Sequence, residues 1–111
     1  MSPMVLVVES YPDLRTGIVA ALRRYQYECD AVATPEAAVL KLREHAYAYF
    51  VIDLDSPDST DELVASFEPD ANVILISDDD PGNEPDQRFP TLRKPFSRDE
   101  LMAQVRALPA A

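Results

Sequence analysis

Four side chains with the chemistry for phosphoryl transfer stand at the ends of separate strand-like segments: Glu9, Asp53, Ser77 and Lys94. A carboxylate can act as a nucleophile toward phosphorus, and carboxylate oxygens are the ligands that Mg²⁺ prefers. A lysine and a hydroxyl can stabilise the oxygens of the transferred group. This chemistry requires the four side chains, far apart in the sequence, to meet at one place.

The elements that must position them alternate along the chain. Continuous apolar runs typical of buried strands occupy 4–8, 49–53 and 73–77, and weaker strand patterns occupy 27–33 and 91–93. Helical patterns lie over about 14–25, 35–45, 62–67 and 100–108. Three of these helices have N-terminal capping signals, namely Thr34 before Pro35, Ser59 with Glu62, and Ser97 with Glu100.

This alternation predicts one α/β domain over residues 1–111, with a doubly wound, five-stranded parallel sheet covered by helices on both faces. The carboxyl ends of parallel strands share one edge of such a sheet, and binding sites form there. We therefore expect the four candidate side chains to converge at that edge.

One connection departs from the alternation. The segment 78–88 (DDDPGNEPDQR) has no apolar residue, two prolines and a glycine, so we expect the fourth helix to be short or absent. Its loss would expose Phe89, Leu92 and Phe96. An uncovered apolar patch of this kind predicts a homodimer contact or packing against an output domain, unless the acidic loop folds over it.

The same residues resemble the receiver domain of bacterial two-component response regulators. The matching motifs are Glu9 after VLVV, Asp53 in VIDLDSP, Ser77 in VILIS, and Lys94 before Pro95 and Phe96. The resemblance covers nearly the whole chain and implies a flavodoxin-like fold with strand order 2-1-3-4-5. It also implies that Asp53 accepts a phosphoryl group from a histidine kinase or phosphotransfer protein. The chain would then be a signalling domain that catalyses at most its own phosphorylation and dephosphorylation.

The resemblance further implies the roles of the surrounding residues. Mg²⁺ would be held by Glu9, Asp53 and the backbone carbonyl of Asp55. Ser77 and Lys94 would contact the phosphoryl group, and the Lys94–Pro95 bond would be cis.

The sequence also departs from the family pattern. Receivers usually carry two adjacent acids after the first strand, whereas here the second position is Ser10, a weaker Mg²⁺ ligand. The usual glycine after the phosphoacceptor is Asp61, and the usual aromatic residue before the lysine is Thr91. Two interpretations stay open. Either Asp53 is phosphorylated, with Asp55 or Asp58 compensating for Ser10, or the chain is a pseudo-receiver that serves as a docking or dimerisation module.

A phosphatase of the haloacid-dehalogenase-like type is a further alternative. Asp53-Leu54-Asp55 after a hydrophobic strand resembles the first motif of that family, in which the second aspartate is the general acid–base. Against it, the motif lies far from the chain start, Pro57 replaces the usual Thr or Val, and 111 residues leave little room for a cap over a substrate.

Composition excludes other classes of function. Twenty acidic and ten basic residues give a net charge of -10, which argues against direct nucleic-acid binding. No apolar run is long enough to span a membrane, and the single cysteine, Cys29, suits a reducing compartment. We therefore expect a cytoplasmic protein that contacts neither nucleic acid nor membrane.

Overall fold

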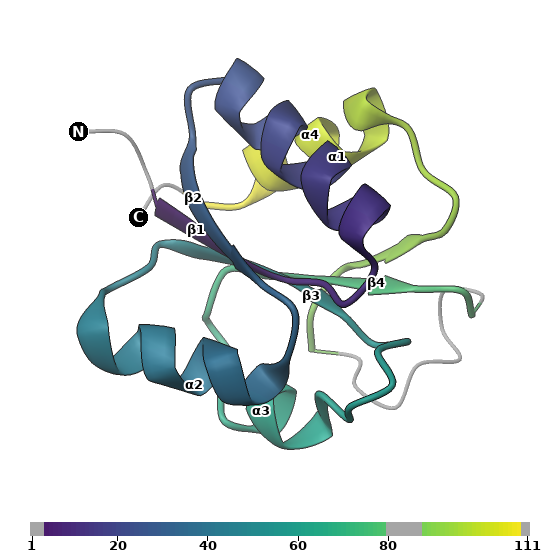
Figure 1. The fold of residues 1–111 in the computed structure, drawn as a ribbon. Coiled ribbons are helices and arrows are strands. Elements are labelled where there is room, and N and C mark those ends of the chain that lie inside the picture. Colours follow the sequence, from purple (N-terminus) through teal and green to yellow (C-terminus); the bar gives the residue numbers. More distant parts are fainter. Residues whose placement is uncertain (1–3, 80–87, 110–111) are drawn as a thin grey trace.

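The computed structural model of the protein describes residues 4–79 and 88–109. Strands and helices alternate over most of this chain, as the hydrophobic pattern predicts (Figure 1). The elements are β1 (Met4–Val8), α1 (Pro12–Arg24), β2 (Glu28–Val32), α2 (Pro35–Glu44), β3 (Tyr49–Asp53), α3 (Asp61–Ala65), β4 (Val73–Ser77), β5 (Thr91–Arg93) and α4 (Arg98–Ala107).

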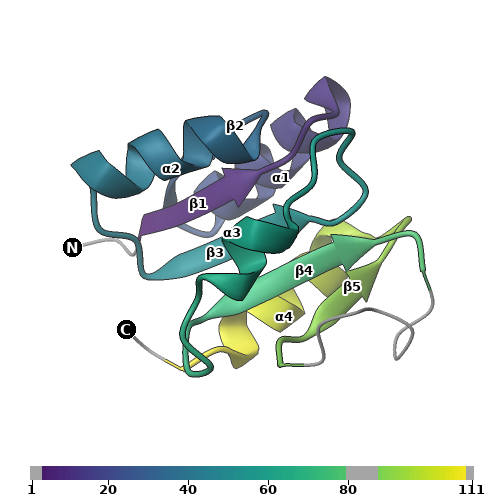
Figure 2. The ribbon, with the colours of Figure 1, turned by 90° about the horizontal axis from the view of Figure 1, so that it is seen from below.

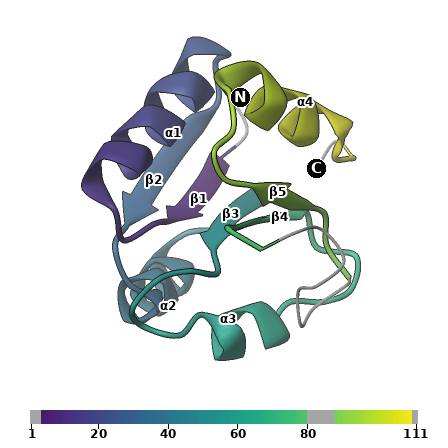
Figure 3. The ribbon, with the colours of Figure 1, turned by 90° about the vertical axis from the view of Figure 1, so that its right-hand side faces the viewer.

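The five strands form one parallel sheet in the order β2-β1-β3-β4-β5 (Figure 2). Helices α1 and α4 cover one face of the sheet, and α2 and α3 cover the other (Figure 3). This is the doubly wound, flavodoxin-like arrangement that the sequence predicts, with the predicted strand order.

Two apolar clusters fill the spaces between the sheet and its helices. Because side chains alternate along a strand, Val5 and Val7 of β1 join the cluster under α1 and α4, and Leu6 and Val8 join the cluster under α2 and α3. The central strands β3 and β4 are buried along their whole length. Covering on both faces explains why these strands read as continuous apolar runs.

Two of the three predicted helix caps are confirmed. The Thr34 side chain accepts a hydrogen bond from the Ala37 amide, and Ser97 forms a reciprocal capping box with Glu100. The capping box predicted at Ser59 is wrong, because α3 begins after Thr60 and the N-cap side chain makes no capping bond. Ser59 Oγ instead accepts from the Asp61 amide at 3.2 Å, as in a local turn.

The connection between β4 and β5 is described only at its ends. Most of the segment for which we predicted a short or absent helix, residues 80–87, lies outside the described residues. The flanking residues 78–79 and 88–90 are not helical. Within the described residues, no helix has the length and apolar character needed to cross a membrane.

The prediction of an exposed apolar patch at this flank is wrong. Phe89 and Leu92 are buried, with 6% and 7% of their surface exposed, and Phe96 packs partly buried against the core. Phe89 belongs to the cluster under α2 and α3, and Leu92 to the cluster under α1 and α4. The predicted homodimer or output-domain contact through these residues therefore loses its basis.

Arg88 helps to hold Phe89 inside. Its guanidinium donates to the carbonyl oxygens of Val64 at 2.9 Å and Phe67 at 3.0 Å, and lies 4.8 Å from the Phe89 ring centroid. These contacts fasten the chain entering β5 to the end of α3. The sequence pattern did not reveal them, because they depend on which loop carbonyls face the arginine.

Candidate functional site

The ends of four strands bring the candidate residues to one edge of the sheet. Glu9 follows β1, Asp53 ends β3, Ser77 ends β4 and Lys94 follows β5, and all four strands run in the same direction (Figure 2). Main-chain hydrogen bonds between neighbouring strands continue up to this edge. The Glu9 amide donates to Val32 at 3.0 Å, and the Lys94 amide donates to Ser77 at 2.9 Å.

Asp53 and Lys94 form the centre of the site. Asp53 is fully buried, and the Lys94 ammonium lies 3.0 Å from each of its two carboxylate oxygens. The backbone amide of Asp55 donates a further hydrogen bond to Asp53 Oδ1 at 2.8 Å. A buried carboxylate is costly without such partners, so these contacts compensate for the burial of Asp53.

Lys94 is held by more than one acid. Burial lowers its pKa, but the hydrogen bond and charge of Asp53, together with Glu9 and Asp55, outweigh burial and raise the pKa above its ordinary value. The ammonium also lies 3.4 Å from Asp55 Oδ2 and 5.1 Å from the centroid of the Tyr11 ring. Lys94 therefore carries a firm positive charge next to Asp53.

Glu9 is the second buried carboxyl of the site. Its Oε2 accepts from the Tyr11 amide at 3.2 Å, but Oε1 has no hydrogen-bond partner. Burial first, and then the neighbouring Asp53, raise the pKa of Glu9 to about 8. In the metal-free protein, this raised pKa favours the protonated form of Glu9 at neutral pH.

Ser77 and Ser10 lie at the same edge of the sheet. Ser77 is buried, and its hydroxyl accepts a hydrogen bond from the Asp79 amide at 3.0 Å. Ser10 Oγ is buried without a partner, while the guanidinium of Arg15 donates to the backbone carbonyls of Glu9 and Ser10 at 2.9 and 3.4 Å. Arg15 therefore fixes the turn that carries both Glu9 and Ser10.

The oxygen atoms of the site fit a magnesium ion that is bound by few protein ligands. The unpartnered Glu9 Oε1 and the Asp53 carboxylate are hard oxygen ligands, and Mg²⁺ commonly keeps several waters. The carboxylate of Asp55 is already engaged, because its Oδ2 accepts from the Asp78 amide at 2.7 Å. Asp58 is exposed to solvent. In the described part of the chain, no three His, Cys, Asp or Glu side chains group together as metal ligands.

Three residues make contacts in the site that the sequence did not predict. Thr60 is buried and its hydroxyl donates to the Asp53 carbonyl at 3.2 Å, which ties the start of α3 to the end of β3. Tyr11 covers the Lys94 ammonium, and the Asp55 side chain contacts Lys94. Of these three residues, only Asp55 was a candidate site residue from the sequence, as a possible Mg²⁺ ligand.

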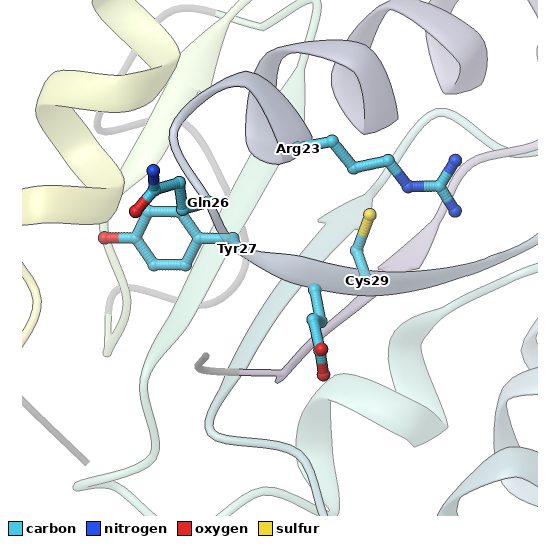
Figure 4. A pocket seen from close by; sticks show the side chains of 5 residues that line it. Arg23, Gln26, Tyr27 and Cys29 are labelled. Carbon is cyan, nitrogen blue, oxygen red and sulfur yellow. The ribbon is translucent and has the colours of Figure 1, made fainter. Parts of the chain in front are cut away.

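A surface pocket lies away from this site. A cavity of about 310 Å³ is lined by residues at the end of α1 and the start of β2, among them Arg23, Tyr27 and Cys29 (Figure 4). It is at the amino end of β2, whereas the candidate site is at the carboxyl ends of the strands. Burial raises the pKa of the Cys29 thiol, so this cysteine is not an activated nucleophile.

Comparison with known proteins identifies the fold. No protein-family model matches the sequence, and no curated protein matches it. Among solved structures, a response regulator protein of Thermotoga maritima, in complex with Mg²⁺ and BeF, has a TM-score of 0.81 and 25% identity. The alignment covers 98% of this chain and 100% of that one.

Other solved structures agree. The chemotaxis response regulator CheY4 of Vibrio cholerae has a TM-score of 0.83 at 18% identity, covering 98% of this chain and 100% of that one. The receiver domain of a Pseudomonas aeruginosa sensor histidine kinase, with magnesium in its active-site cleft, has a TM-score of 0.79 at 23% identity, covering 97% and 98%.

The protein thus has the CheY-like fold of response-regulator receiver domains. This fold supports a role in phosphorelay signalling, as the sequence resemblance implied.

Proposed function

We propose that this chain is a receiver domain that accepts a phosphoryl group on Asp53 from a histidine kinase or a phosphotransfer protein. The observation that supports the proposal best is the Lys94 ammonium, 3.0 Å from both oxygens of the fully buried Asp53 carboxylate. A buried carboxylate that is paired with one fixed cation is a suitable nucleophile for phosphorus.

In the transfer step, an Asp53 oxygen would attack the phosphorus atom of a phosphohistidine. The new bond is the phosphorus–oxygen bond of an acyl phosphate. The phosphorus–nitrogen bond breaks, and its electron pair leaves with the imidazole nitrogen, which takes up a proton from water. Lys94 would stay beside the oxygens of the transferred group, and the buried hydroxyl of Ser77 is the candidate donor to one of them.

Glu9 and Asp53 are the side chains that would hold magnesium, and the Asp55 carbonyl is the further ligand implied by the family resemblance. Mg²⁺, when bound, would neutralise charge on the phosphoryl oxygens. The protonated state of Glu9 fits this role, because a cation would replace the proton and bring Glu9 to its ionised form.

A pseudo-receiver that is never phosphorylated is the second candidate. It is favoured by Ser10, whose neutral hydroxyl stands where receivers carry a second acid and has no partner in the site. The phosphatase alternative is less favoured, because the Asp55 carboxylate is committed to the Asp78 amide and to Lys94 and is poorly placed to act as a general acid–base.

Intact-mass spectrometry after incubation with acetyl phosphate and Mg²⁺ tests the proposal. We expect the wild type to gain one phosphoryl group and Asp53→Asn to gain none. The pseudo-receiver predicts no gain for either protein at millimolar Mg²⁺. Continuous turnover of an aryl phosphate, abolished by Asp55→Asn, would instead support the phosphatase.

A further inference from the structure

We propose that the outer face of helix α2 is a self-association site, through which two copies of this chain form an antiparallel, two-fold symmetric dimer. The contact would be made by Glu36, Val39, Leu40 and Arg43, which we call the α2 patch. It lies on a different part of the surface from the flank of β5 where the sequence predicts a contact. It requires no phosphoryl group on Asp53, so it is separate from the proposed function.

Two large apolar side chains stand exposed next to each other on α2. Val39 is 41% exposed and Leu40 is 58% exposed, and Tyr11 is the only other exposed large apolar residue among the described residues. Neither Val39 nor Leu40 belongs to the two apolar clusters, because α2 packs on the sheet through Ala38 and Leu42. A single exposed leucine is common, whereas an adjacent exposed pair forms an apolar surface that the fold does not cover.

A charged side chain stands at each end of this apolar pair. Glu36 precedes Val39 and Leu40 by three and four residues, and Arg43 follows them by four and three. Residues three or four positions apart lie on the same side of a helix, so the four side chains form one continuous patch. All four are exposed, and no described element lies in front of α2 in the view from this side of the sheet (Figure 2).

Glu36 and Arg43 cannot neutralise each other within one helix. They are seven residues apart, which is about 10 Å along the helix axis. Neither has an oppositely charged residue three or four positions away. Within residues 4–79 and 88–109, neither side chain makes an ion pair. The two charges are therefore available to a partner.

The order of the four residues is self-complementary. The midpoint between positions 36 and 43 falls between positions 39 and 40. When a second α2 lies antiparallel with a two-fold axis at this midpoint, Glu36 of each copy comes level with Arg43 of the other copy. Val39 and Leu40 then pack across the axis, flanked by two ion pairs. A parallel helix pair would instead bring like charges together.

The dimer should be weak. Four side chains from each copy bury less surface than a stable dimer needs, and a net charge of -10 on each copy opposes association at long range. A dissociation constant on the order of 0.1–1 mM corresponds to such a contact. The protein should therefore be monomeric when dilute and increasingly dimeric when concentrated.

Sedimentation equilibrium over a series of protein concentrations, in about 0.15 M salt, measures the association. Glu36→Arg and Arg43→Glu should each weaken it by at least about tenfold, because each variant places two pairs of like charges in the dimer. These variants change the net charge in opposite directions. A general charge effect would strengthen one dimer and weaken the other. Leu40→Gln should also weaken association by about tenfold, because it removes apolar contact at the centre from both copies.

Two combinations of variants test the antiparallel pairing itself. A chain that carries both Glu36→Arg and Arg43→Glu has the two charges exchanged, and it should associate within about threefold of the wild type. A mixture of the two single variants should form heterodimers, because each charge then meets its opposite. Glu62→Arg, at an exposed position of α3, is the matched control. It changes the net charge as Glu36→Arg does and should not weaken association.

The charge variants act against the dipole of α2, so circular dichroism and thermal unfolding must show that each variant is folded. Leu40→Gln leaves the charges of the helix unchanged and keeps the test valid without them. The proposal is overturned if the wild type stays monomeric at millimolar concentration, since the α2 patch would then have another occupant or none. It is also overturned if the α2 variants weaken a dimer no more than Glu62→Arg does, or if the folded charge-exchanged chain stays as weak as the single variants.

Discussion

The Lys94 ammonium and the Asp53 carboxylate are 41 residues apart in the sequence and form a two-pronged contact with both distances at 3.0 Å. The lysine side chain is 13% exposed and the aspartate side chain is fully buried. The contact links the end of β3 to the residue after β5, and β4 lies between these two strands in the sheet. Its strength and its chemical role can be tested separately.

Removal of the lysine alone should destabilise the fold. Lys94→Met leaves Asp53 buried without its counter-charge, and the free energy of unfolding should fall by about 2–4 kcal/mol. Asp53→Asn in the same protein should restore much of this loss, because no unpaired charge then remains. Urea denaturation of the two single variants and the double variant measures the coupling. Lys41→Met is the control; an equal loss there, or no coupling in the double variant, contradicts the account.

The stability of the metal-free protein should depend on Glu9 ionisation. Its pKa is about 8 in the folded protein, above the ordinary value of 4.5, so the folded state binds a proton more tightly than the unfolded chain. The contribution of Glu9 is therefore fully present below the unfolded pKa and is lost as pH rises toward 8, by up to about 1.4 kcal/mol per pH unit.

Glu9→Gln isolates this contribution, because it keeps the shape of the side chain and does not titrate. The difference in unfolding free energy, variant minus wild type, should rise between pH 5 and about 8 and then level off. Chemical denaturation at a series of pH values, with a chelator present, measures it. A flat difference would mean that Glu9 is already ionised in the folded protein.

A second acid at position 10 should strengthen magnesium binding. Ser10 Oγ is buried and unpartnered beside Glu9, and affinity for Mg²⁺ grows with the number of charged ligands. Ser10→Asp should lower the dissociation constant for Mg²⁺ by on the order of tenfold, measured by calorimetry. Ser10→Asn, which has a similar shape and no charge, should change it far less. Equal affinities for the two variants would place the metal elsewhere.

The hydroxyl of Thr60 should contribute to the position of Asp53. Its hydrogen bond to the Asp53 carbonyl, at 3.2 Å, is buried. Thr60→Val keeps the shape but leaves that carbonyl with one partner fewer, so the unfolding free energy should fall by about 1 kcal/mol. Thr60→Ser should restore most of it. Thr16, which is exposed on α1, provides the control Thr16→Val, for which a change within about 0.5 kcal/mol is expected.

Much of the fold could be predicted because its signals are local. The apolar runs of β1, β3 and β4 and the caps at Thr34 and Ser97 reflect burial and hydrogen bonding of neighbouring residues. The positions of Glu9 and Asp53 followed from the rule that parallel strands end at a common edge. These predictions needed no knowledge of long-range packing.

The failures of prediction concern long-range contacts. Ser59 and Glu62 have capping-box spacing, but Thr60 became the N-cap and its hydroxyl was drawn to Asp53, a tertiary contact. The sequence predicts Phe89 at the surface because the segment before it has no helical pattern, yet Phe89 is part of the core. Arg88 beside it donates to the Val64 carbonyl of α3. The spacing of residues along one segment carries no information about such partners.

The central claim is that Asp53 carries the phosphoryl group, and reductive trapping tests it most directly. Borohydride reduces an aspartyl phosphate to homoserine, which tandem mass spectrometry locates in the digested protein. After treatment with acetyl phosphate and Mg²⁺, we expect homoserine at position 53, and none when the donor is omitted or when Asp53→Asn removes the acceptor carboxylate. Homoserine at another aspartate, or at none under conditions in which a known receiver is trapped, would contradict the account.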